Sequence, residues 1–123
     1  MPNNPNSTTP PTEDCYRHKV VSARAALSQI KRGSRVFIGT GCGEPRHLIE
    51  TMVATESLQD ITLYQMLSIA LARFVHEPAF LKRFALKLFF ISQPLRKAAF
   101  EGKIDYIPAY LSQIPGLFSS HRI

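Results

Sequence analysis

Gly39-Thr40-Gly41-Cys42-Gly43-Glu44-Pro45 is the stretch of sequence that decides the fold. It follows the short apolar run 36–38 and precedes residues 46–55, whose apolar side chains recur at helical spacing. The alternating glycines allow positive φ and let a ligand approach backbone N–H groups, while Pro45 pre-sets the φ of the first helical residue. The stretch therefore predicts a strand that turns through glycines into a helix, at a junction suited to binding a ligand.

Strand and helix patterns alternate outward from this junction. Strands are predicted at 35–38, 61–64, 88–91 and 104–107, and helices at 23–32, 45–55, 77–84, 92–102 and 109–114. Residues 65–75 fit either a strand leading into a loop or a short helix, and they stay unassigned. Units of strand, helix and strand close right-handed with parallel strands, which places the glycine stretch at the carboxyl edge of a sheet. The predicted fold class is α/β, an open, mainly parallel sheet with flanking helices.

Several residues mark the ends of the predicted elements. Ser22 is a good N-cap for the first helix, and Gly33 falls where a left-handed C-cap is expected. The nearly continuous apolar character of 35–38 predicts a strand covered on both faces. Pro115 is expected to end the last helix, so that residues 117–123 add no closing element.

The composition is that of an ordinary soluble domain, 45% hydrophobic and 20% charged over 123 residues. No apolar run approaches the roughly 18–20 residues that a membrane-spanning helix needs, and no secretory signal is visible. These features predict a cytoplasmic protein without a membrane partner. The proline-rich, polar residues 1–14 are predicted to form a disordered leader, followed by one domain at 15–123.

The cysteines and the positive charge exclude some classes of protein. Cys15 and Cys42 do not form the pattern of a disulfide-stapled domain and are predicted to be free thiols. The net charge of +6 is spread over single or paired basic residues, which favours a solvated surface over nucleic-acid binding and would also suit a phosphorylated cofactor. No histidine or cysteine stands at metal-ligand spacing, so no metal site is predicted.

The glycine stretch admits two interpretations. Dinucleotide binding requires a third glycine at position 44, where Glu44 would repel a pyrophosphate, and no P-loop triplet occurs. The backbone N–H groups could instead hold a carbonyl, carboxylate or thioester oxygen. A tight turn that only reverses the chain is equally consistent with the sequence. The default role of Glu44 is to cap the helix that follows, and Cys42, without a histidine at a motif spacing, is interpreted as structural rather than nucleophilic.

A second group of candidate residues lies near the end of the chain. Arg96, on the predicted helix at 92–102, could hold a carboxylate or phosphate. Asp105 and Tyr106 end the fourth predicted strand on the same side of the sheet. Each of these residues alone is more typical of a surface salt bridge or of packing.

Beyond these local patterns, the order of several motifs resembles one family. The glycine stretch is followed by Phe89-Phe90-Ile91, Arg96-Lys97-Ala98, Gly102-Lys103-Ile104-Asp105-Tyr106-Ile107-Pro108 and Leu111-Ser112-Gln113-Ile114-Pro115. From about Tyr16 to its last residue, the chain is similar to the N-terminal region of the acetyl-CoA hydrolase/transferase family. That family includes acetate, butyrate and 4-hydroxybutyrate CoA-transferases.

The resemblance implies a function and a set of site residues. In the family, a glutamate in the second half of a longer chain attacks the acyl-CoA and forms a glutamyl-CoA thioester. No glutamate of this chain matches it, so the chain is expected to be an incomplete N-terminal part of the domain, inactive by itself. The substrate-binding candidates are Gly39, Thr40, Gly41, Cys42, Gly43, Glu44, Pro45, Asp105, Tyr106 and Pro108, and Arg96 is the candidate for binding coenzyme A.

The implied partners are acyl-CoA, small carboxylic acids and the remainder of a CoA-transferase chain. Coenzyme A enters as a substrate, no metal or nucleic acid is expected, and assembly into a homo-oligomer stays open. Two other classes are kept as alternatives. One is a non-catalytic module that binds CoA or a nucleotide, and the other, less favoured, is a small basic nucleic-acid-binding protein.

Overall fold

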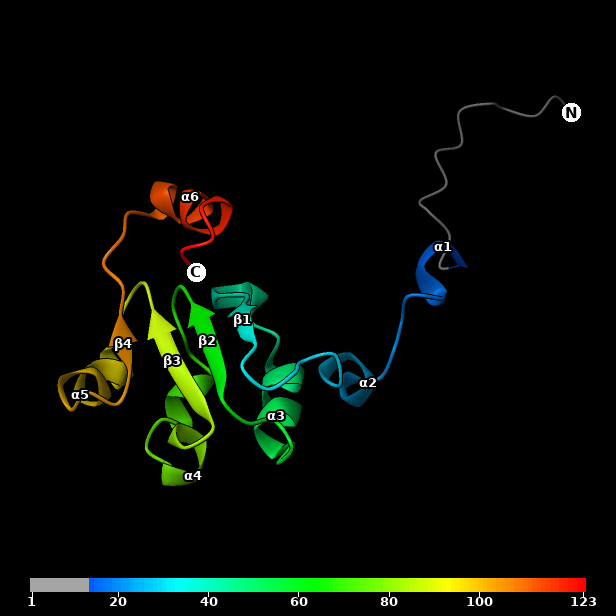
Figure 1. Ribbon diagram of the computed structural model, residues 1–123, viewed down its shortest axis with the longest axis horizontal. Helices are drawn as coiled ribbons and strands as arrows, with labels where there is room; N and C mark the ends of the chain where they lie inside the picture. Colours follow the sequence, from blue (N-terminus) through cyan, green and yellow to red (C-terminus); the bar gives the residue numbers. More distant parts are fainter. Residues whose placement is uncertain (1–13) are drawn as a thin grey trace, which may run out of the picture.

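A four-stranded parallel sheet organises the protein, as a computed structural model describes it over residues 14–123. The strands follow one another in the order β1-β2-β3-β4, so β1 and β4 are the two edges (Figure 1). The predicted leader falls outside the described residues except for Asp14, which begins the first short helix. The predicted fold class, an open parallel α/β sheet with flanking helices, is confirmed.

The helices and strands alternate along most of the chain. The strands are β1 (Arg35–Ile38), β2 (Ile61–Gln65), β3 (Phe84–Leu88) and β4 (Asp105–Tyr106). The α-helices are α1 (Asp14–Arg17), α2 (Ala23–Leu27), α3 (Arg46–Ala54), α4 (Pro78–Leu81), α5 (Arg96–Phe100) and α6 (Ile114–Ser119). Short 3-10 turns are formed by Gly41–Gly43, Leu71–Arg73, Gln93–Leu95 and Leu111–Gln113. None of the described helices is long and apolar enough to cross a membrane.

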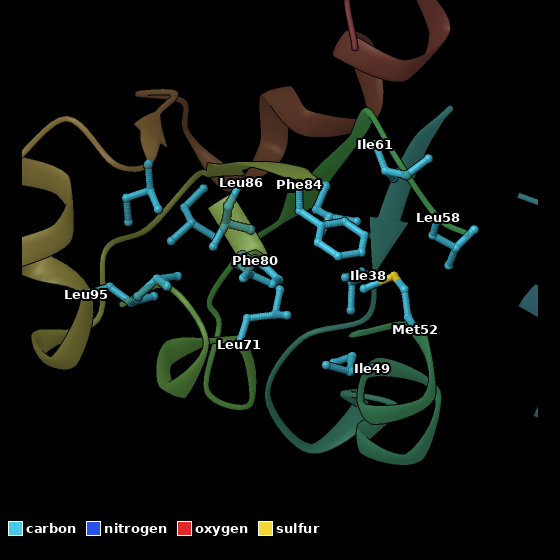
Figure 2. Close-up of a cluster of buried hydrophobic side chains, with 14 of the residues drawn as sticks. Ile38, Ile49, Met52, Leu58, Ile61, Leu71, Phe80, Phe84, Leu86 and Leu95 are labelled. Carbon is cyan, nitrogen blue, oxygen red and sulfur yellow. The ribbon is translucent and has the colours of Figure 1, made fainter. Parts of the chain in front are cut away.

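The main hydrophobic core lies on one face of the sheet. Alternate residues of β2 and β3 point to this face, and Leu63, Leu86 and Leu88 are almost fully buried there. Figure 2 shows side chains from α3 and α4, among them Met52 and Phe80, meeting those of the strands. Burying each such side chain contributes about 1.5–3 kcal/mol, so this face holds the two helices on the sheet.

A smaller cluster covers part of the opposite face. Tyr64 of β2 packs there with Phe89 and with Ile114 of α6. Phe118 of α6 meets Phe37 of β1 edge to face, with ring centroids 5.1 Å apart. The last helix therefore closes one end of the second face (Figure 1).

This closing helix corrects the prediction for the end of the chain. Pro115 lies in the first turn of α6 and does not end a helix. A first-turn N–H has no partner within the helix, so proline costs nothing there, and its fixed φ favours the helical conformation. The helix predicted at 109–114 is replaced by the 3-10 turn Leu111–Gln113, and α6 begins only at Ile114 and runs on to Ser119.

The third strand also differs from its prediction. It spans Phe84–Leu88 and not 88–91, and α4 ends at Leu81 where a helix to residue 84 was predicted. The alternation of buried Phe84, Leu86 and Leu88 with the more exposed residues between them satisfies the period of a strand. The apolar run at 88–91 attracted the prediction because it is continuous, but its later residues form the loop after the strand.

The first helix and the first strand are corrected as well. Ser22 caps α2 as predicted, its hydroxyl accepting from the Ala25 N–H at 3.2 Å, but α2 ends at Leu27 and not at 32. The chain then turns so that the Gly33 N–H donates to the Asp60 carbonyl at 3.0 Å, and Gly33 has φ +78°. Gly33 lies in this later turn and is not the C-cap of the first helix that was predicted, a position that Ser28 takes. The strand β1 is not fully covered on both faces, because Phe37 stays 43% exposed, and it forms one edge of the sheet.

Arg83 ties the third strand to the end of α3. Its guanidinium donates to the carbonyls of Val53 at 2.6 Å and Thr55 at 3.0 Å, and it lies 4.9 Å from the centre of the Phe84 ring. Carbonyls in the last turn of a helix have no partner within the helix, so these bonds stabilise its C-terminus.

Replacing Arg83 with methionine is expected to lower the free energy of unfolding by about 2 kcal/mol, because charge-assisted hydrogen bonds to two helix-end carbonyls are lost. Urea denaturation followed by circular dichroism measures the change. The neighbouring exposed Lys82, changed to methionine, is the matched control and should shift the stability by less than about 0.5 kcal/mol. Equal effects of the two variants would show that the guanidinium contacts contribute nothing.

Candidate functional site

The glycine stretch forms a tight turn at the carboxyl edge of the sheet, directly after β1. Gly41–Gly43 make a 3-10 turn in which the Gly43 N–H donates to the Thr40 carbonyl at 3.0 Å and the Glu44 N–H to the Gly41 carbonyl at 3.2 Å. Gly41 has φ +58°, the left-handed region that favours glycine. Two of the N–H groups that were predicted to be open to a ligand are therefore already used within the turn.

Thr40 fixes this turn to the segment that follows β2. Its hydroxyl donates to the Leu67 carbonyl at 2.6 Å and accepts from the Leu67 N–H at 2.9 Å. Because β1 and β2 are parallel neighbours, their following loops leave the same edge of the sheet side by side. One hydroxyl thus satisfies both backbone groups of a residue 27 positions away and holds the two loops together.

Glu44 does not cap α3, which corrects the prediction made for it. Its side chain is buried, and Oε1 accepts from Gln65 Nε2 at 2.8 Å and from the Ile69 N–H at 3.2 Å, while Oε2 accepts from the Ala70 N–H at 3.0 Å. The carboxylate therefore satisfies donors of the neighbouring loop instead of those of its own helix. A local reading of the sequence could not supply this partner, because the loop lies 25 residues further along the chain.

Gln65 is the site residue that the sequence analysis missed. It ends β2 fully buried, and its Nε2 also donates to the Gly39 carbonyl at 2.9 Å. The one sequence signal for Gln65 was its place as a polar residue directly after the predicted strand 61–64. It also began the segment 65–75, whose structure stayed unassigned. The structure resolves that segment as the end of β2, a loop and the turn Leu71–Arg73.

Two polar atoms at this edge retain hydrogen-bonding capacity. Gln65 Oε1 and Ser68 Oγ are buried and make no hydrogen bond within the described part of the chain. The Ser68 carbonyl accepts from the hydroxyl of Ser92 at 3.2 Å, which brings the loop after β3 into the same network. Buried polar atoms are normally paired, so these two are the groups through which the network can bond a water molecule or a polar ligand atom.

The remaining residues of the glycine stretch lie near the surface. Cys42 is exposed and not in a disulfide, as predicted, whereas the side chain of Cys15 lies outside the described part of the chain. Pro45 occupies the position before α3. With Gly39 it borders an apolar hollow of about 230 Å³ between α2, β1 and α3.

Over residues 14–123 no three histidine, cysteine or carboxylate side chains gather in a way that could hold a metal ion.

The second group of candidates lies at and near β4, the edge strand opposite β1. Asp105 forms an exposed salt bridge with Lys87 of β3, at 3.2 Å between Oδ2 and Nζ. Tyr106 and Arg96 line an apolar groove of about 460 Å³ between β4 and α5, and Pro108 follows in the segment that leads to α6. Both groups belong to the carboxyl half of the sheet, but β2 and β3 separate β4 from the glycine turn after β1. The structure does not bring them into contact.

The charge around α5 is largely neutralised by local pairs. Glu101 accepts from Lys103 at 2.6 Å and lies 3.8 Å from Lys97. The hydrogen bond from Lys103, assisted by the positive charge of both lysines, lowers the pKa of the Glu101 carboxyl. Because Glu101 is exposed, the effect on stability is small and screened by salt.

A parallel open sheet whose first strand ends in a clamped glycine turn defines an open α/β domain. The chain belongs to the acetyl-CoA hydrolase/transferase N-terminal domain family, whose model matches residues 4–121. The predicted family resemblance is thereby confirmed.

Two curated relatives are similar to most of this chain. A 4-hydroxybutyrate coenzyme A transferase of Clostridium kluyveri is 27% identical over 112 residues, which are 90% of this chain and 26% of that protein. A succinyl-CoA:acetate/propanoyl-CoA:succinate CoA transferase of Fasciola hepatica is 34% identical over 97 residues, 76% of this chain and 20% of that protein. The chain thus spans about a quarter or less of the length of these relatives.

The fold is shared with a solved structure. The crystal structure of RipA from Yersinia pestis superposes with a TM-score of 0.69 at 19% sequence identity. The match covers 85% of this chain and 27% of RipA. The likeness establishes the fold, and again only over the smaller part of the longer protein.

Proposed function

We propose that this chain forms the N-terminal part of a CoA-transferase or acetyl-CoA hydrolase that moves CoA between acyl-CoA and short carboxylates. The observation that carries the proposal is the family match over residues 4–121, nearly the whole chain. The names of the two curated relatives, both CoA transferases, support the transferase reading. The predicted cytoplasmic location stays a prediction.

The proposed chemistry is covalent catalysis by a glutamate that lies outside this chain. The carboxylate attacks the acyl-CoA carbonyl, releases CoA as the thiolate and forms a mixed anhydride. The thiolate then attacks the glutamyl carbonyl, which releases the carboxylate of the donor acid and leaves a glutamyl-CoA thioester. An acceptor carboxylate reverses these two steps and leaves as its CoA thioester, whereas attack by water gives hydrolysis.

We propose that this chain forms one side of the substrate-binding site. The turn from Gly39 to Pro45 is rigid, since Thr40 and Glu44 fix it to the loop after β2, and it offers a close approach to acyl or carboxylate oxygens. Asp105, Tyr106 and Pro108 are proposed to line the same carboxyl edge further along the sheet. Arg96 is proposed to hold a phosphate of CoA through its guanidinium.

Exchange of labelled acetate into acetyl-CoA tests the proposal. We expect none by the chain alone, and exchange when this chain replaces the matched N-terminal part of the C. kluyveri transferase in a fusion. A fusion that elutes as a folded species but neither exchanges CoA nor hydrolyses acyl-CoA would overturn the proposal.

Calorimetric titration of the chain with CoA separates the alternative of a non-catalytic binding module. Part of a site wall is expected to give no measurable heat of binding by itself. Tight CoA binding by the chain alone, without exchange in the fusion, would favour the module.

A further inference from the structure

A groove between β4 and α5 presents two aromatic rings to solvent. It is lined by Ile91, Arg96, Ala99, Phe100 and Tyr106, and its volume of about 460 Å³ lies within the roughly 300–1,000 Å³ of small-molecule sites. Phe100 is 92% exposed and Tyr106 is 52% exposed. Over residues 14–123 neither ring stacks on another aromatic ring, so both can contact a ligand.

Arg96 gives this groove an unbalanced positive charge. Over residues 14–123 its guanidinium forms no hydrogen bond or ion pair. The carboxylates that lie near it in sequence are engaged elsewhere, because Glu101 is paired with two lysines and Asp105 with Lys87. The charge of Arg96 is therefore free to bind an anionic group of a ligand.

The chemistry of the lining fits a purine nucleotide. The planar base of a nucleotide stacks on aromatic side chains, and a guanidinium forms paired hydrogen bonds with a phosphate. An aliphatic ligand would leave the charge of Arg96 unmatched, and a small carboxylate would leave the rings of Phe100 and Tyr106 uncovered. A ligand with both a base and a phosphate matches all three side chains.

The groove reaches the same edge of the sheet as the glycine turn. Ile91 lies in the loop after β3 and Tyr106 ends β4, so both mark the carboxyl edge, where the glycine turn follows β1. Three inter-strand spacings of about 4.8 Å separate β1 from β4, roughly 14 Å in all (Figure 1). CoA carries its thiol and its adenine nucleotide at opposite ends of a long pantetheine arm. One CoA molecule can therefore extend from the groove to the glycine turn.

We propose that the groove binds the adenine nucleotide of CoA, with the base on Phe100 and Tyr106 and a phosphate on Arg96. The inference rests on the proposed function, in which the glycine turn receives the acyl end. The two groups of candidate residues then stand apart because they hold opposite ends of one ligand.

The first test compares two substrates in the fusion with the C. kluyveri transferase. Acetyl-pantetheine carries the thioester but lacks the nucleotide. Phe100→Ala and Arg96→Gln are each expected to lower kcat/KM for acetyl-CoA at least ~10-fold and to leave kcat/KM for acetyl-pantetheine unchanged. The exposed Leu111 and Lys97, which do not line the groove, provide the matched controls Leu111→Ala and Lys97→Gln, which should change neither value. An unchanged kcat/KM for acetyl-CoA, or an equal loss with both substrates, would overturn the proposal.

Thiol modification in the same fusion gives a readout that does not depend on catalysis. Ala99→Cys places a thiol in the groove and keeps Arg96 and both rings. Mass spectrometry of peptides separates its alkylation from that of the exposed Cys42. We expect saturating CoA to slow alkylation at position 99 at least ~10-fold and pantetheine to leave it unchanged. A thiol that is unreactive without CoA would show that polypeptide fills the groove, and this result, like the absence of protection by CoA, contradicts the proposal.

Failure of this inference is distinguishable from failure of the proposed function. A fusion that exchanges CoA normally after Phe100→Ala, and in which CoA does not protect position 99, would keep the enzymatic role and remove the nucleotide site. A folded fusion in which CoA protects position 99, but which neither exchanges CoA nor hydrolyses acyl-CoA, would remove the enzymatic role and leave the nucleotide site.

Discussion

Gly39→Ala is expected to lower the free energy of unfolding by about 3 kcal/mol, at the upper end of what forced overpacking costs. A Cβ at this position would lie 2.6 Å from the carbonyl oxygen of Gly43, closer than real Cβ atoms come to other atoms. That oxygen belongs to the backbone of the glycine turn and cannot rotate away. The clash would also disturb the bond from Gln65 to the Gly39 carbonyl. Urea denaturation of the purified chain gives the change directly.

The other two glycines of the turn provide graded controls. Gly41 has open space around a Cβ but φ +58°, so alanine there should cost about 1–2 kcal/mol. Gly43 has open space and no positive φ, so alanine should change the stability by less than about 1 kcal/mol. We predict that the loss of stability on substitution by alanine decreases in the order Gly39, Gly41, Gly43. Equal costs at all three positions would contradict the packing argument.

Glu44→Gln is also expected to lower the free energy of unfolding by about 3 kcal/mol. The amide keeps the shape of the side chain, but its NH₂ group faces N–H donors, so at least one of the donors Gln65 Nε2, Ile69 N–H and Ala70 N–H loses its acceptor. Hydrogen exchange at the Ile69 and Ala70 amides should accelerate in the same variant. Chemical denaturation and exchange together report the loss of the clamp between the two loops.

Glu50→Gln is the matched control for this variant. Glu50 also accepts a short bond, at 2.6 Å from Arg73, but both side chains are more than half exposed, so the cost should stay below about 1 kcal/mol. If Glu44 acted only as a helix cap, glutamine would be tolerated nearly as well, and the two variants would be alike. That outcome would restore the interpretation that the structure rejects.

The sequence allowed the fold class to be predicted because its signals are local. A β-branched strand, a glycine turn and a proline-led helix are fixed by the allowed backbone angles of those residues, and the order of such units implies a parallel sheet. The predicted element bounds were wrong where the local sequence pattern and the tertiary packing favour different structures. The third strand was displaced toward 88–91 because the apolar run was continuous, whereas register opposite Ile61 and Leu63 selects Phe84 and Leu86.

The candidate site was predictable only in part, for a related reason. The position of the glycine stretch at the carboxyl edge follows from chain connectivity, and the structure places it there. The partners of Glu44 and the role of Gln65 depend on contacts between residues that are adjacent in space but 21 to 26 residues apart in sequence. No periodicity or motif spacing records that contact.

The sequence by itself determined the strand-turn-helix unit, the parallel α/β class and the family, because these depend on backbone preferences and on the order of short motifs. The tertiary structure alone decided that Glu44 clamps a neighbouring loop, that two strands separate β4 and its Tyr106 from the glycine turn after β1, and that Tyr106 and Arg96 line one groove between β4 and α5. The physical reason is that a buried carboxylate takes whichever N–H donors packing brings within reach, and packing is set by the whole sheet.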